Sequence, residues 1–208
     1  MKVLITGTAK GIGNAIALKF LDMGHEVIGF DILDSTINND KYTHYAIDVY
    51  QSELPDINDI DILINNAGGI LNKRTDTVDG IEKTFQVNVL SMFLLTELLM
   101  DKLSESKATV ISTTSIAANL FTKHFDINDI QNVHNYNAKD AYGEAKLEDL
   151  LLTKEFHNRY HVRDINFTAF EPGIPRTNFS SEGPKFFNFM YHSIFKYIFT
   201  LPRFFYMF

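Results

Sequence analysis

Six short, continuously apolar runs recur along the chain, and longer stretches with helical spacing lie between most of them. Runs without polar alternation are typical of strands buried on both faces of a parallel sheet. Alternation of such strands with helices predicts a doubly wound α/β fold with right-handed crossovers. The predicted strands are Lys2–Thr6, Glu26–Phe30, Thr43–Ile47, Ile60–Ile64, Thr109–Thr113 and Asn166–Phe170.

The stretches between the strands predict three main helices. Apolar residues recur at helical spacing in Asn14–Met23, Val78–Leu103 and Tyr142–Tyr160. Two connections break this pattern. Residues 48–61 are too few for a full crossover helix and predict a loop with one turn of helix, while the polar stretch Asn119–Asp140 predicts an inserted surface loop.

Composition excludes several classes of protein. A chain of 208 residues suits one domain, and it contains no Cys, so disulfides, thiolate metal sites and cysteine nucleophiles are ruled out. His124 and His134 have no ligand-type neighbours at metal spacing, and we expect no metal site. The formal net charge of −7 argues against a nucleic-acid partner, because phosphate binding needs a basic face.

The beginning of the chain predicts a cytoplasmic location. The apolar run Val3–Ile5 is too short for a signal peptide and leads straight into a glycine-containing loop. The sequence has no charge-free apolar stretch of the length that a membrane-spanning helix needs.

That loop, Thr6-Gly7-Thr8-Ala9-Lys10-Gly11-Ile12-Gly13, lies between the first predicted strand and the first predicted helix. Free backbone N–H groups and the helix dipole attract an anion at such a position. Gly7 permits a tight turn, Gly11 allows the backbone to approach a pyrophosphate, and Gly13 allows close packing of helix on strand. The loop predicts a dinucleotide site, with an ordinary strand–turn–helix as the alternative.

Acidic residues end the second and third predicted strands. Asp31 is placed to accept hydrogen bonds from the adenosine ribose and to repel a 2′-phosphate, which favours NAD over NADP. Lys10 favours the opposite choice, because a cation in the glycine loop can meet a 2′-phosphate. Asp48 is placed to meet the adenine amino group, although it is equally suited to form a turn.

Further motifs follow in a familiar order. They are Asn65-Asn66-Ala67-Gly68, then Ser115, then Tyr142-Gly143-Glu144-Ala145-Lys146. Together with the glycine loop they make the chain resemble the short-chain dehydrogenase/reductase family over residues 1–177. The glycine spacing is similar to the family's classical form, and the segment around Tyr142 is similar to its retinol-dehydrogenase-like branch.

The resemblance implies a Rossmann fold, a nicotinamide cofactor and a set of site residues. It implies a catalytic role for Asn88, Ser115, Tyr142 and Lys146. It implies that the cofactor is bound by Gly7, Gly11, Ile12, Gly13, Asp31, Asp48, Asn65, Gly68, Tyr142, Lys146, Pro172, Gly173 and Thr177.

The chemistry of the Tyr–Lys pair is consistent with that implication. Residues four apart share one helix face, so the ammonium of Lys146 can lie near the phenol of Tyr142. We expect this cation, together with the positive nicotinamide of the oxidised cofactor, to lower the phenol pKa towards neutrality, so that Tyr142 exchanges a proton with a substrate oxygen. Ser115 would hydrogen-bond the same oxygen, Lys146 would also hold the nicotinamide ribose, and Asn88 would fix a water.

The C-terminal part departs from the family. The chain reaches only Phe208, so we expect six strands with the family's usual final strand missing. Residues 178–208 hold half of the 18 Phe and are predicted to form a helical substrate lid of the same domain. A surface for a partner subunit and a membrane-surface helix are the alternatives, the latter disfavoured by Pro184 and Pro202.

Two functions follow from these patterns. The first is an NAD(P)-dependent oxidoreductase that interconverts an alcohol and a ketone or aldehyde, with a small and apolar substrate. The second is a non-catalytic dinucleotide-binding regulator or sensor whose substrate half is incomplete. The apolar residues spread around Val78–Leu103 and Tyr142–Tyr160 predict a homo-oligomer, and in the family these helices pair across a two-fold axis.

Overall fold

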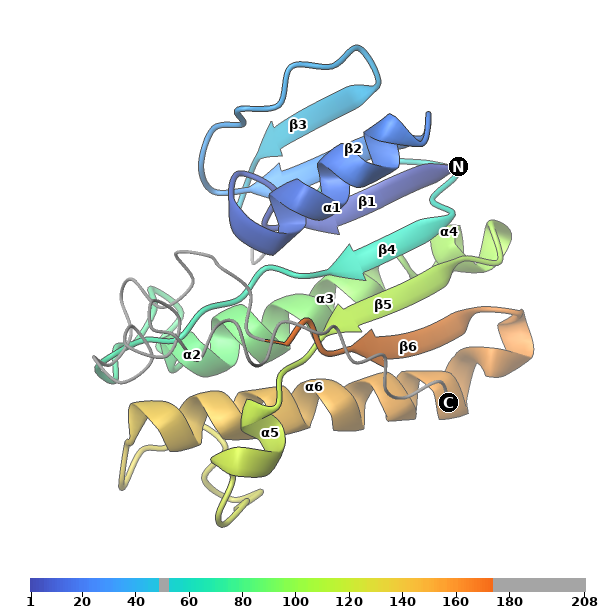
Figure 1. Cartoon of the computed structure of the whole chain (residues 1–208). Coiled ribbons are helices and arrows are strands. Elements are labelled where there is room, and N and C mark those ends of the chain that lie inside the picture. Colours follow the sequence, from blue (N-terminus) through green and yellow to red (C-terminus); the bar gives the residue numbers. More distant parts are fainter. Residues whose placement is uncertain (49–52, 174–208) are drawn as a thin grey trace.

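The computed structural model describes residues 1–48 and 53–173, and within them it confirms a parallel α/β sheet (Figure 1). The sheet has six strands in the order β3-β2-β1-β4-β5-β6, and every neighbouring pair is parallel. The strands are β1 (Lys2–Thr6), β2 (Glu26–Asp31), β3 (Tyr42–Ala46), β4 (Ile62–Asn65), β5 (Thr109–Thr113) and β6 (Asn166–Phe170). Their carboxyl ends all point to one edge of the sheet.

Helices cover both faces of this sheet. The principal ones are α1 (Gly11–Asp22), α3 (Ser91–Leu98), α4 (Met100–Glu105) and α6 (Ala138–Tyr160). Shorter segments are α2 (Lys83–Phe85), the π-helix η1 (Gln86–Leu90), α5 (Ala117–Leu120) and the 3-10 helix η2 (His161–Arg163). In the described part of the chain, no helix is both long and apolar enough to cross a membrane.

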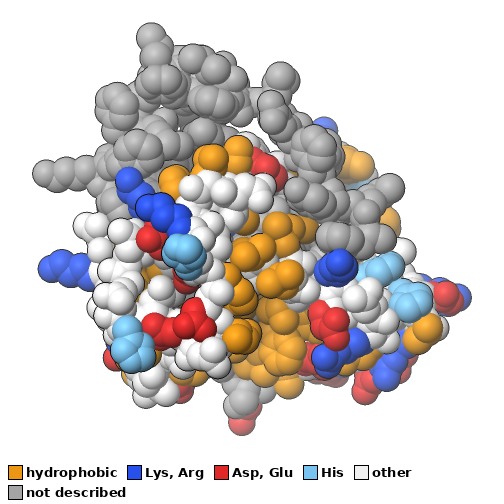
Figure 2. Space-filling view, turned by 90° about the horizontal axis from the view of Figure 1, so that it is seen from below, with side chains coloured by type: hydrophobic (Ala, Val, Ile, Leu, Met, Phe, Trp, Pro, Cys, Tyr) orange, Lys and Arg blue, Asp and Glu red, His pale blue; other side chains and the backbone are white. Residues whose placement is uncertain are grey.

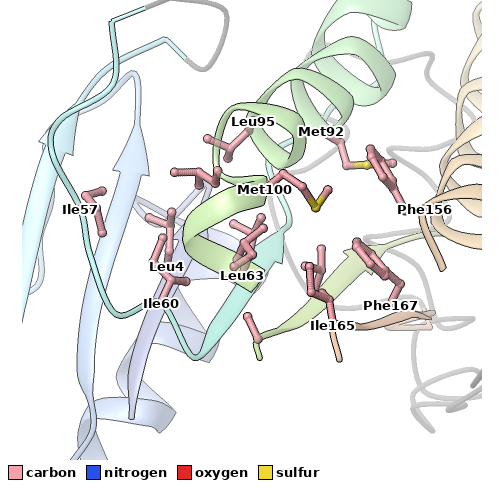
Figure 3. Packing of buried hydrophobic residues seen from close by; sticks show 14 of the residues in the cluster. Leu4, Ile57, Ile60, Leu63, Met92, Leu95, Met100, Phe156, Ile165 and Phe167 are labelled. Atoms are coloured by element: carbon pink, nitrogen blue, oxygen red, sulfur yellow. The ribbon is translucent and has the colours of Figure 1, made fainter. Parts of the chain in front are cut away.

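Residues of β1 alternate between two cores, because successive side chains of a strand point to opposite faces. Leu4 faces a large cluster formed with α3, α4 and α6 (Figure 3). Val3 and Ile5 face a smaller cluster with Ala17 and Leu21 of α1. The two clusters fix α1 on one face of the sheet and the longer helices on the other.

Most predicted elements are confirmed. Three strands, β1, β5 and β6, have both predicted ends, and the others shift by one or two residues. Residues 53–61 form a loop, as predicted, but they do not contain the expected turn of helix. The predicted surface loop is shorter than Asn119–Asp140, because α5 continues to Leu120 and α6 already begins at Ala138.

The prediction of one helix over Val78–Leu103 is wrong at its start and in its continuity. Gly80 has a positive φ of 72° and ends a turn, and Val78 is fully exposed. The helical segment begins after Glu82, whose carboxylate accepts hydrogen bonds from the backbone N–H groups of Thr84 and Phe85. The segment then passes through the π-helical turn η1 and breaks again at Leu99, between α3 and α4.

Candidate active site

The glycine loop joins β1 to α1 through two residues with left-handed backbone. Gly7 has a φ of 76° and Gly11 a φ of 66°, conformations that glycine adopts without steric cost. Gly13 is required for a different reason: a Cβ placed on it would lie 2.1 Å from the carbonyl oxygen of Gly7. The loop and the first turn of α1 are therefore in direct backbone contact.

The N-terminus of α1 fits an anionic group. Lys10 is its cap residue and makes no side-chain capping bond. The N–H groups of the first helical turn, among them that of Ile12, have no partner within the helix and point along its dipole. A pyrophosphate is the group that such a turn and glycine loop accommodate.

Asp31 lies at the end of β2 beside this loop. One of its carboxylate oxygens accepts a 2.8 Å hydrogen bond from the backbone N–H of Ala9, and the other accepts a 3.0 Å bond from that of Leu33. The carboxylate is thus held next to the glycine loop, where the sequence predicts the adenosine ribose.

Asn66 and not Asn65 contacts the glycine loop through its side chain. Its Nδ2 donates a 2.9 Å hydrogen bond to the carbonyl of Thr6, whose hydroxyl accepts from the backbone N–H groups of Asn66 and Ala67. The Asn65 side chain points into the core and donates to Thr96 of α3. The role of Asn65 in cofactor binding stays a prediction, and its side chain, on the last residue of β4, faces α3 rather than the glycine loop.

The remaining predicted cofactor residues lie at the same edge of the sheet or outside the described residues. Asp48 follows the end of β3 and is half-buried, and Pro172 and Gly173 follow β6. Gly173 has a φ of 72°. Thr177 and the predicted lid over residues 178–208 lie outside the described residues.

Two of the predicted catalytic residues, Asn88 and Lys146, lie beside Gly68. A Cβ placed on Gly68 would lie 2.7 Å from Oδ1 of Asn88 and 3.5 Å from Nζ of Lys146. That Nζ atom is 5.8 Å from the centre of the Tyr142 ring. Elements far apart in sequence, the loop after β4, η1 and α6, therefore form one site at the carboxyl edge.

Ser115 is distinguished from the three hydroxyl residues before it. The side chains of Ser112, Thr113 and Thr114 are buried. Those of Ser112 and Thr114 bond to α6, the first to the hydroxyl of Thr153 and the second as a donor to the carbonyl of Lys146. Ser115 is half-buried and hydrogen-bonded to the phenol of Tyr142. The structure therefore brings together the serine and the tyrosine chosen from the sequence.

Asn88 sits in the π-helical turn η1, and its side chain is fully engaged. Nδ2 donates to the carbonyls of Thr84 and Gly69, and Oδ1 accepts from the N–H of Gly69. π-Helical turns inside longer helices recur at functional sites. Here the turn ties the loop around Gly69 to the helix, so Asn88 shapes the wall of the site.

The expected effect of Lys146 on Tyr142 is wrong for this structure. Burial raises the pKa of the Tyr142 phenol well above its ordinary value, while the hydrogen bond from Ser115 opposes the rise and the Asp149 carboxylate adds to it. Lys146 donates a 2.7 Å hydrogen bond to Asp149 and a 3.2 Å bond to the carbonyl of Thr113. Its cation is already paired with a carboxylate.

Asp149 is the site residue that sequence reasoning missed. It lies three residues after Lys146 and seven after Tyr142, a spacing that places all three on one face of α6. Both partners of the ion pair are buried, with 6% and 3% of their side chains exposed. The helical spacing was the available signal, because a carboxylate on that face must meet the lysine.

The sheet order, the glycine loop and the Ser–Tyr–Lys cluster at the carboxyl edge together define a doubly wound α/β protein of the dehydrogenase class. The family model described as short chain dehydrogenase matches residues 1–185. The chain belongs to this family.

Relatives of known name support the same assignment. Human retinol dehydrogenase 13 is 33% identical over 84% of the chain, and the mouse protein of that name is 30% identical over 97%. A putative daunorubicin C-13 ketoreductase from Streptomyces is 30% identical over 84% of the chain. The match spans 59% of the human protein's length, 67% of the mouse protein's and 66% of the ketoreductase's.

Solved structures share the fold. A 4-hydroxyisoleucine dehydrogenase mutant complexed with NADH and succinate has a TM-score of 0.69 at 22% identity, covering 88% of this chain and 76% of that one. The closed form of serine dehydrogenase complexed with NADP⁺ has a TM-score of 0.68 at 23% identity, covering 92% and 79%.

Glu148, beside Asp149 in α6, makes the stability of the protein depend on pH. Burial raises its pKa from 4.5 to about 8, with further contributions from the carboxylates of Asp149, Glu144 and Glu82. Below pH 4.5 the carboxyl is protonated whether the chain is folded or unfolded. Between pH 4.5 and about pH 8 only the folded chain keeps the proton, so the free energy of unfolding falls as pH rises. The full loss of stability is present above about pH 8.

We predict that Glu148→Gln increases the free energy of unfolding above about pH 8, by on the order of a few kcal/mol, and changes it little below about pH 4.5. Denaturant unfolding at the two pH values measures the difference. Glu155→Gln is the control, because that carboxylate is exposed on the same helix and paired with Arg159. Equal effects of Glu148→Gln at both pH values would contradict the prediction.

Proposed function

We propose that the protein is an NAD-linked oxidoreductase that interconverts an alcohol and a ketone or aldehyde. The observation that carries the proposal is that Tyr142 is bonded to Ser115 and lies near Lys146, whose ammonium reaches Gly68 at the sheet edge that also holds the glycine loop. Membership of the short chain dehydrogenase family supports it.

The dinucleotide fits the residues present. The uncapped turn of α1 would hold its pyrophosphate, the Asp31 carboxylate its adenosine ribose, and Lys146 its nicotinamide ribose. When bound, the nicotinamide ring would accept or donate the hydride. NADH in one structural relative and NADP⁺ in another support this class of cofactor, and Asp31 favours NAD.

The residues of the chain would handle the substrate oxygen and its proton. Ser115 is placed to donate a hydrogen bond that polarises a carbonyl. Tyr142, bonded to the same hydroxyl, gives its proton to that oxygen during reduction and takes it back during oxidation. Asn88 holds the loop around Gly69 in place.

An apolar substrate fits the surroundings of Tyr142. Its ring packs in a cluster with Ile70 and Ala117, and Phe121 lies against them. The similarity to proteins named retinol dehydrogenase agrees with an apolar alcohol or carbonyl compound. The cytoplasmic location expected from the sequence stays a prediction.

Tyr142→Phe tests the proposed chemistry. The change removes only the phenol hydroxyl, so we expect turnover of aldehydes and ketones to fall below a few per cent while NADH affinity stays nearly unchanged. Cofactor oxidation assays and fluorescence titration measure the two quantities. Tyr136→Phe, which removes a hydroxyl bonded to Thr84 and Leu71, is the control. Binding of NADH by the wild type without turnover of any carbonyl would favour the regulator instead.

The position of the Asp31 carboxylate beside the glycine loop predicts which cofactor the protein prefers. We expect the protein to bind NADH more tightly than NADPH, because the Asp31 carboxylate repels a 2′-phosphate. Asp31→Asn should reduce the preference about tenfold or more, since it removes that charge. Asp34→Asn, at an exposed position in the following loop, should leave it unchanged. Fluorescence titration that shows NADPH bound tenfold more tightly by the wild type would contradict the assignment and favour a role for Lys10.

We propose a homodimer formed by α3 and α6. Phe93 and Leu98 of α3 and Leu151 of α6 are 39–49% exposed, and Phe93 stacks on Phe156 of α6, which joins the two helices into one surface. Figure 2 shows apolar side chains gathered in a band across this side of the molecule. Apolar patches of this kind mark interfaces, and two-fold dimers are the commonest closed assembly.

Light scattering tests the dimer. We expect about twice the chain mass for the wild type and the chain mass for Leu151→Glu, because a carboxylate in the interface would remain desolvated and unpaired. Leu18→Glu on α1, where the leucine is also 49% exposed, should leave the mass unchanged. A monodisperse wild-type particle of the chain mass at micromolar concentration would contradict the proposal.

A further inference from the structure

The Lys146 ammonium is held by two hydrogen bonds. It donates to Oδ2 of Asp149 at 2.7 Å and to the carbonyl of Thr113 at 3.2 Å. A long lysine side chain has several rotatable bonds, and two acceptors from different elements fix the position of its nitrogen. Asp149 therefore helps to determine where the cation lies relative to Tyr142 and Gly68.

Asp149 is itself held in place. The Thr153 hydroxyl, one turn further along α6, donates to the backbone carbonyl of Asp149 at 2.6 Å. It is also hydrogen-bonded to the hydroxyl of Ser112 in β5 at 3.0 Å, which anchors this turn to the sheet. Burial raises the pKa of the Asp149 carboxyl, and the charge and hydrogen bond of Lys146 oppose the rise. Its Oδ1 is buried and has no hydrogen-bond partner among the described residues.

Among the described residues, Asp149 is the charged group that acts on the Tyr142 phenol. The segments β5, β6, α5 and η1, which all pack against α6, contain no ionisable side chain. The charged groups at α2 are Lys83, which is exposed, and Glu82, which caps the helix. In η2, which also packs against α6, His161 bonds to the carbonyl of His157 and Arg163 to Asp101. On α6 itself, the carboxylate of Glu144 accepts a hydrogen bond from Asn132, and Glu148 lies beside Asp149.

We propose that Asp149 is a positioning residue that fixes the Lys146 ammonium and offsets its charge, so that Tyr142 keeps its phenol proton at neutral pH. The inference rests on the proposed function for its consequence in catalysis. Reduction adds a hydride to the carbonyl carbon and the Tyr142 proton to its oxygen, whereas oxidation removes both. The phenol is the form that reduction requires, and Asp149 therefore favours carbonyl reduction at neutral pH and confines oxidation to alkaline pH.

The physical basis is the balance of two opposite charges. An isolated ammonium near a phenol stabilises the phenolate and lowers the pKa of the phenol by about 1–3. A carboxylate 2.7 Å from that ammonium makes the pair nearly neutral when seen from Tyr142. Removal of the carboxylate leaves the cation uncompensated inside the protein, where charge interactions are strong.

Carbon-13 tyrosine NMR on the full chain tests this directly, with Tyr142→Phe to assign the resonance. In the wild type we expect Tyr142 to keep its phenol signal up to the highest pH at which the fold persists. In Asp149→Asn the phenolate signal should appear at a pH lower by about one unit or more than in the wild type. This is about a tenfold change in the ratio of phenolate to phenol at a given pH. Asp149→Ser repeats the test with a smaller neutral side chain, and Asp149→Glu, which retains the charge, should titrate as the wild type does.

Glu148→Gln is the matched control, because it removes the neighbouring buried carboxylate, which has no ion pair with Lys146. It should leave the Tyr142 titration unmoved. The pH profile of alcohol oxidation should shift to lower pH in Asp149→Asn, parallel to the NMR titration. An unmoved Tyr142 titration in folded Asp149→Asn or Asp149→Ser overturns the proposal. A shifted titration without turnover in any variant supports the role of Asp149 and contradicts the proposed oxidoreductase function.

Discussion

The pairing of β1 with β4 at the centre of the sheet determines where everything else lies. From this pair the chain builds outward to β3 on one side and to β6 on the other. Connections therefore leave the two central strands in opposite directions, the arrangement in which open α/β sheets have a ligand crevice beyond the carboxyl ends of those strands. The glycine loop after β1 and Gly68 after β4 flank this crevice, and Asn66 ties the two loops together through Thr6.

The predicted parts of the fold are those fixed by local chemistry. Continuous apolar runs gave the strands, because a strand buried on both faces permits no polar alternation. The helix start at Val78 failed because apolar spacing does not report the turn at Gly80 or the capping by Glu82. The π-helical turn around Asn88 has no signature in apolar periodicity, since it changes the backbone bonding rather than the pattern of residues.

The candidate site was predicted in its members but not in its electrostatics. Ser115, Tyr142 and Lys146 belong to a recognisable motif, and the structure brings them together. Asp149 belongs to no motif that the sequence analysis used, although it shares their helix face. A motif names the residues that touch a reacting group, whereas the charge on each depends on every buried neighbour, and burial is a property of the folded chain.

The burial of the Lys146–Asp149 pair limits which substitutions the site tolerates. Loss of one member leaves an uncompensated buried charge, which is strongly destabilising, whereas exchange of both for packed neutral residues costs little. Lys146 is needed for the proposed chemistry, so Asp149 cannot vary freely without moving that cation or leaving it unpaired. The hydrogen bond between Thr153 and Ser112 holds this turn of α6 against β5, where the Lys146–Asp149 pair is buried from solvent. A substitution at Thr153 would therefore reach Tyr142 through the position of Asp149, although the threonine touches neither the phenol nor the lysine ammonium.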